Sequence, residues 1–143
     1  MMGLVYTEIT LKNVGDVIEV NRGYRAEKEV RTVTVQALVD TGSGTLVITE
    51  AVRDRLGLAI KGMRNSTLAN SARQLCQVTE PVEIHWKDRE TACPALVVPG
   101  AGEVLLGAIP LEDMDLMVDP DGQRNGREGL VGVHGDEPLT MLK

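Results

Sequence analysis

The alternation of apolar and polar residues with a period of two limits the fold of this chain more than any other feature. Over residues 5–12, Val, Thr, Ile and Leu alternate with Tyr, Glu, Thr and Lys, which gives a strand one buried and one solvated face. The pattern returns over residues 31–39, and an apolar, β-branched run follows at residues 45–48. A helix would instead need apolar residues every three or four positions. The sequence therefore predicts a mainly β fold.

Further strands are expected along the rest of the chain. We predict that residues 17–20 close an opening hairpin after a turn at residues 13–16, and that Pro94 makes residues 91–98 an edge or bulged strand. The other expected strands are residues 63–68 paired with 73–78, residues 82–86 paired with 91–98, and residues 104–106, 130–133 and 139–142.

Two short helices are expected between these strands. Thr49 offers an N-cap and Gly57 a left-handed C′ residue, so a helix of about two turns is predicted between them. Pro110 suits the first position of a second helix. The inward-facing residues of that helix are predicted to be Leu111, Met114 and Met117.

Length and composition exclude several classes of protein. With 143 residues, of which 43% are hydrophobic and 25% charged, the chain is expected to form one domain over residues 1–143. Aromatic residues make up 2% and Phe is absent, so stacking platforms for single-stranded nucleic acid are missing. A formal charge of -6 would also repel a phosphate backbone. We therefore expect no nucleic-acid partner.

The cysteines and the hydropathy pattern bear on metals and membranes. Neither Cys76 nor Cys93 belongs to a Cys-x-x-Cys motif or adjoins a histidine, so we expect no disulfide framework and no zinc site. No stretch approaches the ~18 apolar residues that span a bilayer, and residues 1–13 do not read as a secretion signal. We expect a cytoplasmic protein with no membrane partner and no bound metal.

The motif with the strongest chemical content is Asp40-Thr41-Gly42. It follows the apolar residues 37–39 and precedes Ser43 and a second apolar strand, which places the aspartate at the apex of a tight β-loop with hydrophobic walls. Such walls are a poor environment for a charge that is merely solvated. Gly42 frees the backbone to fold back on itself. This loop is therefore the first candidate for a functional site.

Around this loop the chain resembles the retropepsin-like aspartic proteases, the single-domain relatives of the pepsin-like enzymes. Residues 37–43 match the apolar-apolar-Asp-Thr-Gly-Ser pattern of that family, and residues 104–107, Val-Leu-Leu-Gly, match the element behind its active-site loop. Order and spacing agree over roughly residues 33–119. The resemblance implies a mainly β, closed-barrel-like acid protease fold with two short helices.

The resemblance also implies a role for each residue of the loop. Asp40 would be the catalytic carboxylate, Thr41 would join the hydrogen bonds that tie two active-site loops together, and Gly42 would let the substrate backbone approach. Ser43 would offer its hydroxyl to an outer carboxylate oxygen. The supporting element behind the loop would comprise Leu105, Leu106 and Gly107.

The chemistry implied by the resemblance needs two carboxylates that share a proton. The chain holds a single Asp-Thr-Gly, so a second copy must come from another subunit, in a two-fold symmetric homodimer with the active site on its axis. The implied activity is endopeptidase hydrolysis of a peptide or protein substrate without a cofactor.

Residues 63–74 lie where the family has a flap hairpin over the cleft. Flaps in the family often carry glycine at the tip, whereas this tip has none, although Asn70 tolerates a left-handed backbone. The residues of the flap expected to bind substrate are Leu68, Ala69, Asn70, Ser71 and Ala72.

Other interpretations of these residues remain open. A dimeric module of the same fold could bind a peptide or protein without cutting it; the unusual flap tip favours that reading and the intact Asp-Thr-Gly opposes it. Asp40 could also be a local turn cap. Acidic residues at the start of the second helix, Glu112, Asp113 and Asp115, could suggest a divalent cation, but such charges are common there. Neither His85 nor His134 accompanies a nucleophile motif.

Overall fold

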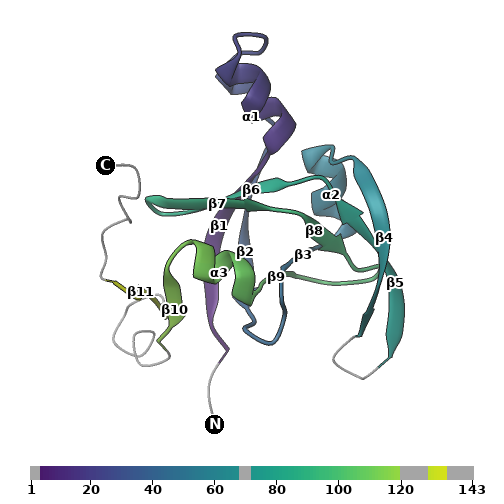
Figure 1. Ribbon diagram of the computed structural model, residues 1–143, viewed down its shortest axis with the longest axis vertical. Coiled ribbons are helices and arrows are strands. Elements are labelled where there is room, and N and C mark those ends of the chain that lie inside the picture. The colour runs from purple at the N-terminus through teal and green to yellow at the C-terminus, as the bar shows by residue number, and fades with distance from the viewer. Residues whose placement is uncertain (1–3, 68–71, 120–128, 135–143) are drawn as a thin grey trace.

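The structure is a computed structural model that describes residues 4–67, 72–119 and 129–134 (Figure 1). The strands are β1 (Tyr6–Asn13), β2 (Thr32–Val39), β3 (Leu46–Ile48), β4 (Ile60–Thr67), β5 (Arg73–Thr79), β6 (Val82–Trp86), β7 (Arg89–Cys93), β8 (Ala95–Val97), β9 (Val104–Leu106), β10 (Leu116–Val118) and β11 (Leu130–Gly132). The helices are α1 (Val14–Asn21), the short 3₁₀ helix η1 (Glu27–Glu29), α2 (Glu50–Leu56) and α3 (Ala108–Asp113).

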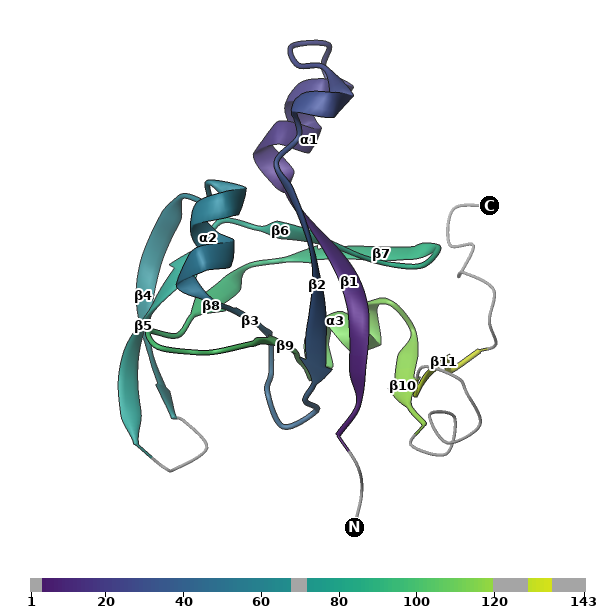
Figure 2. The ribbon, with the colours of Figure 1, turned by 180° about the vertical axis from the view of Figure 1, so that it is seen from behind.

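Nine of the described strands form one sheet, in the order β4-β5-β8-β3-β9-β2-β1-β6-β7, and β10 pairs with β11. The prediction of a mainly β fold is therefore confirmed. Two details differ: β4 and β7 are free edges among the described strands, so the sheet is not a closed barrel, and there are three α-helices instead of two. Both views place the β4–β5 hairpin and the β10–β11 pair at opposite sides of the molecule (Figures 1 and 2).

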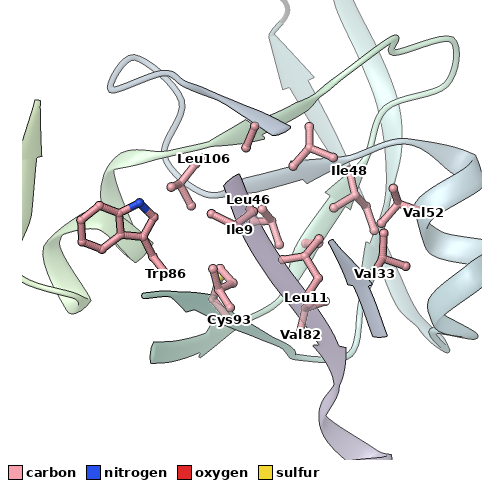
Figure 3. Packing of buried hydrophobic residues seen from close by; sticks show 14 of the residues in the cluster. Ile9, Leu11, Val33, Leu46, Ile48, Val52, Val82, Trp86, Cys93 and Leu106 are labelled. Carbon is pink, nitrogen blue, oxygen red and sulfur yellow. The ribbon is translucent and has the colours of Figure 1, made fainter. Parts of the chain in front are cut away.

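The main core is built almost entirely from aliphatic side chains, because the chain has no Phe. Inward-facing residues of β1, β2, β3 and β6 meet those of α2 (Figure 3), and each fully buried side chain contributes about 1.5–3 kcal/mol. Trp86 is the one aromatic residue in this cluster, and its indole nitrogen donates to Thr7 Oγ1 at 2.8 Å. Cys76 and Cys93 are buried free thiols, and burial raises the pKa of Cys93.

Residues 17–20 do not form the strand that the sequence predicted, because they belong to α1. Asn13 caps this helix by accepting a hydrogen bond from Asp16 N at 3.0 Å, and it also donates to Leu56 O at 2.8 Å. Asp16 in turn accepts bonds from the backbone and guanidinium of Arg31, at 2.8–3.0 Å. Consequently β1 pairs antiparallel with β2 instead of with residues 17–20, and α1 lies between these two strands in the chain and extends beyond the sheet (Figure 2).

The second predicted helix is shorter than expected. Gly107 is the N-cap of α3, so Pro110 is the third helical residue, where a missing N–H costs nothing. The helix ends at Asp113, and Asp115 turns the chain through a left-handed conformation with φ 59°. Leu111 and Met114 are buried as predicted, but Met117 lies on β10 and is 49% exposed, so its predicted inward position is wrong.

Most of the other elements appear where the sequence predicted them. Helix α2 has Thr49 as N-cap and Gly57 as a left-handed C-terminal residue. Pro94 divides residues 91–98 into β7, at the sheet edge, and β8, in its interior. The predicted strand at residues 139–142 lies outside the described residues. No helix in the described part of the chain is long and apolar enough to cross a membrane.

Candidate active site

Asp40 begins the loop that joins β2 to β3, and three backbone hydrogen bonds fix its position. Its amide donates to Leu106 O and its carbonyl accepts from Ser43 N, both at 3.0 Å. Asp40 as a residue is half-buried, and its carboxylate Oδ1 accepts from Gly42 N at 3.0 Å. The loop therefore holds one carboxylate oxygen against its own backbone, which orients the other oxygen for interactions outside the loop.

Strand β9 lies between the two strands that the Asp40 loop connects. It pairs in parallel with β2, where Ala37 faces Val104, and antiparallel with β3, where Val47 faces Leu105. The loop must therefore cross over the end of β9. This arrangement explains why an apolar strand far along the chain accompanies the Asp-Thr-Gly motif.

The crossing requires glycine at position 107. A Cβ atom there would lie 2.2 Å from Thr45 O and 2.6 Å from Ser43 O, closer than any ordinary contact. Immediately after it, Ala108 N donates to Ser43 O at 2.8 Å and Ile109 N donates to Gly44 O at 3.1 Å. The predicted support behind the loop is thus a set of backbone contacts that only a residue without a side chain permits.

A pocket of about 750 Å³ opens beside the Asp40 loop. Its walls combine loop residues with one face of β4 and the segment around β9. The apolar lining residues are Val47, Leu96, Val98, Ala101, Leu105 and Ile109, and the lining residues with polar side chains are Asp40, Ser43, Thr45, Arg64, Ser66, Thr67 and Glu103. The pocket therefore presents a carboxylate next to an apolar surface, a combination typical of ligand-binding sites.

Three predicted loop residues, Asp40, Gly42 and Ser43, line this pocket, whereas Thr41 is exposed and does not. The Ser43 hydroxyl donates to Thr45 O at 3.2 Å; the sequence predicted a bond to a carboxylate oxygen. Leu105 lines the pocket and Leu106 is fully buried behind it.

The β4–β5 hairpin stands at the predicted place of the flap, with Asn65 opposite Leu75. Of the predicted flap residues, Leu68, Ala69, Asn70 and Ser71 lie outside the described residues, and Ala72 is exposed next to β5.

Arg64 and Glu103 also line the pocket, although neither belongs to a motif in the sequence. Strand alternation could have placed Arg64 and Ser66 on one face of the flap strand, but it could not show that this face meets Asp40. Glu103 accepts a hydrogen bond from the Tyr6 hydroxyl at 3.2 Å. That bond and the nearby negative charge raise the pKa of Tyr6.

Side chains that could ligate a metal ion lie on the β6–β7 hairpin, away from the pocket lining. Glu83, His85 and Glu90 bring their ligand atoms within 4.8 Å of one another. The acidic residues at the end of α3 and just after it use their carboxylates differently: Asp115 bonds to His134 Nδ1 at 2.7 Å, and Asp113 accepts from Thr91 Oγ1 at 3.3 Å.

Comparison with known proteins bears on this geometry. A family model described as "gag-polyprotein putative aspartyl protease" matches residues 26–132. Among solved structures, the EIAV protease complexed with the inhibitor HBY-793 is similar with a TM-score of 0.51 and 21% identity, over 79% of this chain and 89% of that chain. A retropepsin-like aspartic protease from Rickettsia conorii aligns with a TM-score of 0.42 and 17% identity, over 83% of this chain and 90% of that one. The search of curated proteins gave no match.

The matched region contains the Asp40 loop, the flap hairpin, β9 and α3, which are the elements that build the pocket. It leaves out β1 and α1. The chain belongs to the retropepsin-like family of gag-polyprotein aspartyl proteases.

Proposed function

We propose that the protein is an aspartic endopeptidase whose active site is completed by a second copy of the chain. The observation that carries this proposal is the Asp40 carboxylate, which is fixed by the Gly42 amide and lines a pocket with an apolar wall. The other carboxylate in that lining, Glu103, accepts a hydrogen bond from Tyr6. The second carboxylate of a dyad would therefore be the Asp40 of a two-fold related partner.

The proposed reaction follows from the opposed protonation states of such a pair. Two carboxylates a few ångströms apart cannot both ionise, so one stays charged and its partner stays protonated. The charged one removes a proton from a water molecule, whose oxygen attacks the peptide carbonyl carbon, while the protonated one donates to the carbonyl oxygen. The intermediate then breaks its C–N bond: the leaving nitrogen takes up the proton that the first carboxylate removed from water, and the second carboxylate recovers its proton from a hydroxyl of the intermediate as the new carboxyl group forms.

Other residues of the loop serve this chemistry indirectly. Thr41 is exposed at the apex of the loop and is therefore available to the equivalent loop of the partner. Gly42 and Gly44 keep side-chain bulk away from the approaching peptide backbone. The flap hairpin, including the predicted binding residues at positions 68–72, would cover an extended peptide and exclude water.

The test is mass-spectrometric detection of products from an unstructured peptide library between pH 3.5 and 7.5. Wild type and Asp40→Asn are compared at equal dimer concentration, together with Asp88→Asn, which makes the same chemical change in the exposed β6–β7 turn. We expect cleavage by wild type and Asp88→Asn, none by Asp40→Asn, and loss of the wild-type activity on dilution to monomer. The rate should fall at high pH, where both carboxylates are charged.

Two results would contradict the proposal. Equal cleavage by Asp40→Asn would remove Asp40 from the reaction. A folded, dimeric wild type that binds library peptides without cutting any would assign the pocket to a peptide-binding module of the same fold.

A further inference from the structure

The pocket floor belongs to a continuous row of residues that crosses five strands of the sheet, and Leu105, Val47 and Leu96 are the members of the row that line the pocket. The strand registers place Leu105 opposite Val47, Val47 opposite Leu96, and Leu96 opposite Val78. Val78 in turn faces Gly62 on β4, where the row ends without a side chain. Since paired residues in a sheet project to the same face, these positions share one surface.

Arg64 stands beside the end of this row and on the same face. It lies two residues after Gly62 and directly opposite Cys76, which is fully buried in the cluster of Val47, Val78 and Leu96. Residues of the opposite face of the hairpin, Met63 and Leu75, are instead about half exposed. The side chain of Arg64 therefore projects from the wall of the pocket, and Arg64 is among the residues that line it.

The guanidinium of Arg64 is available to a ligand. Arg31 and Arg53 pair with Asp16 and Asp54, but Arg64 has no side-chain partner within the described residues. Among the described residues, it is also the only cationic one that lines the pocket. An incoming carboxylate could form a bidentate, charge-assisted pair with it.

We propose that Arg64 is a specificity-determining residue, which selects peptides with Asp or Glu two positions away from the apolar side chain that fills the floor. This inference rests on the proposed function and names its substrate class. In an extended peptide, residues two apart point the same way and are about 7 Å apart. Adjacent strands of the sheet are about 4.8 Å apart, and β5 and then β4 follow β8 in the strand order. When the peptide crosses the strands with its apolar side chain over β8 and β3, the side chain two positions along the peptide therefore lies toward β4.

The size of the preference follows from the exposure of Arg64. An ion pair fully open to water changes affinity only slightly, whereas a bound peptide and flap would shield this one in part. We expect kcat/KM to be about three- to tenfold higher for a Glu peptide than for its Gln counterpart. The ratio should shrink in 1 M salt, because salt screens the charges.

The experiment compares peptides that are identical except for Glu, Gln or Lys at the second position on either side of the apolar residue. The enzymes are wild type, Arg64→Glu, Arg64→Gln and the control Lys61→Glu, which reverses a charge on the same strand outside the pocket lining. Wild type and Lys61→Glu should prefer Glu, Arg64→Gln should show no preference, and Arg64→Glu should prefer Lys. Thermal unfolding of each variant establishes that it is folded.

A binding measurement separates this inference from the proposed function. Fluorescence anisotropy with Asp40→Asn protein reports the same peptide preferences without cleavage. Cleavage with equal rates for Glu and Gln peptides, or a Glu preference that persists in Arg64→Glu, would overturn the role of Arg64 and leave the protease intact. If peptides bind with an Arg64-dependent preference for Glu but wild type cleaves none, only the proposed endopeptidase activity is contradicted. If no peptide is bound or cut, both the proposed function and the role of Arg64 are contradicted.

Discussion

Replacing Gly107 by alanine tests whether the Asp40 loop depends on the close backbone crossing at β9. The added Cβ would lie 2.2 Å from Thr45 O, 2.6 Å from Ser43 O and 2.8 Å from Thr45 N, all of them backbone atoms. Ordinary contacts begin at 3.4 Å, so one of the two segments must move by roughly 1 Å. The backbone angles of Gly107, φ -90° and ψ -177°, are open to alanine, so the whole effect is steric.

The expected loss of stability is about 2–6 kcal/mol. Overpacking against a rigid backbone costs about 1–3 kcal/mol. The displacement also weakens the bonds from Ala108 N to Ser43 O and from Asp40 N to Leu106 O, at about 0.5–1.5 kcal/mol each. For a chain of this length, such a loss lowers Tm by roughly 10 °C or more.

Urea denaturation followed by the fluorescence of Trp86, the single tryptophan, measures the effect. The matched control is Gly62→Ala, because a Cβ at that position meets nothing within 4 Å. The control should lie within about 1 kcal/mol of wild type. If Gly107→Ala were as stable as Gly62→Ala, the steric account of the Leu-Leu-Gly element would be refuted.

Two further predictions concern the caps and charges that fix the helices. Arg31 holds the pKa of Asp16 at about 2, below its ordinary value, so this pair stabilises the fold above pH 4 and is lost as pH falls from about 4 to 2. Between pH 6 and pH 2, the free energy of unfolding of wild type should therefore fall by about 1–2 kcal/mol more than that of Asp16→Asn. An equal fall in the two proteins would contradict this prediction. Thr49→Ala removes the acceptor for Val52 N at 3.1 Å and should cost about 0.5–2 kcal/mol, whereas Thr49→Ser should retain most of the stability. Equal losses in both Thr49 variants would show that the hydroxyl bond is not the cause.

The parts of the fold that follow from local signals were predictable from the sequence. Strand alternation located β1 and β2, and the Thr49 and Gly57 signals located both ends of α2. Residues 17–20 are too short a stretch for their apolar residues to distinguish a strand from a helix, so the predicted strand is wrong. One local signal, the N-cap Asn13, does favour the helix, whereas the contact of Asp16 with Arg31, fifteen residues away, is revealed by no local pattern.

The same distinction applies to the candidate site. Asp40 and Leu106 could be identified because each belongs to a recognisable motif, and the structure brings them together. Arg64 and Glu103 carry no motif, and their place in the pocket depends on the curvature of the sheet and on the pairing of β4 with β5. Met117 was misplaced because the turn at Asp115 ends the helical phase before that residue.

The pairing of β2 with β9 also sets the order in which the molecule can assemble. Ala37 and Val104 are 67 residues apart in the chain, whereas the β4–β5 and β6–β7 hairpins join neighbouring segments. Contacts between distant segments carry a larger loop-closure entropy and form more slowly than local hairpins. During synthesis, Asp40 therefore emerges long before Leu106 and Gly107, the residues that fix its loop. A nascent chain cannot hold Asp40 in its final geometry until β9 has been made, because the partner of the Asp40 amide, Leu106, follows 66 residues later.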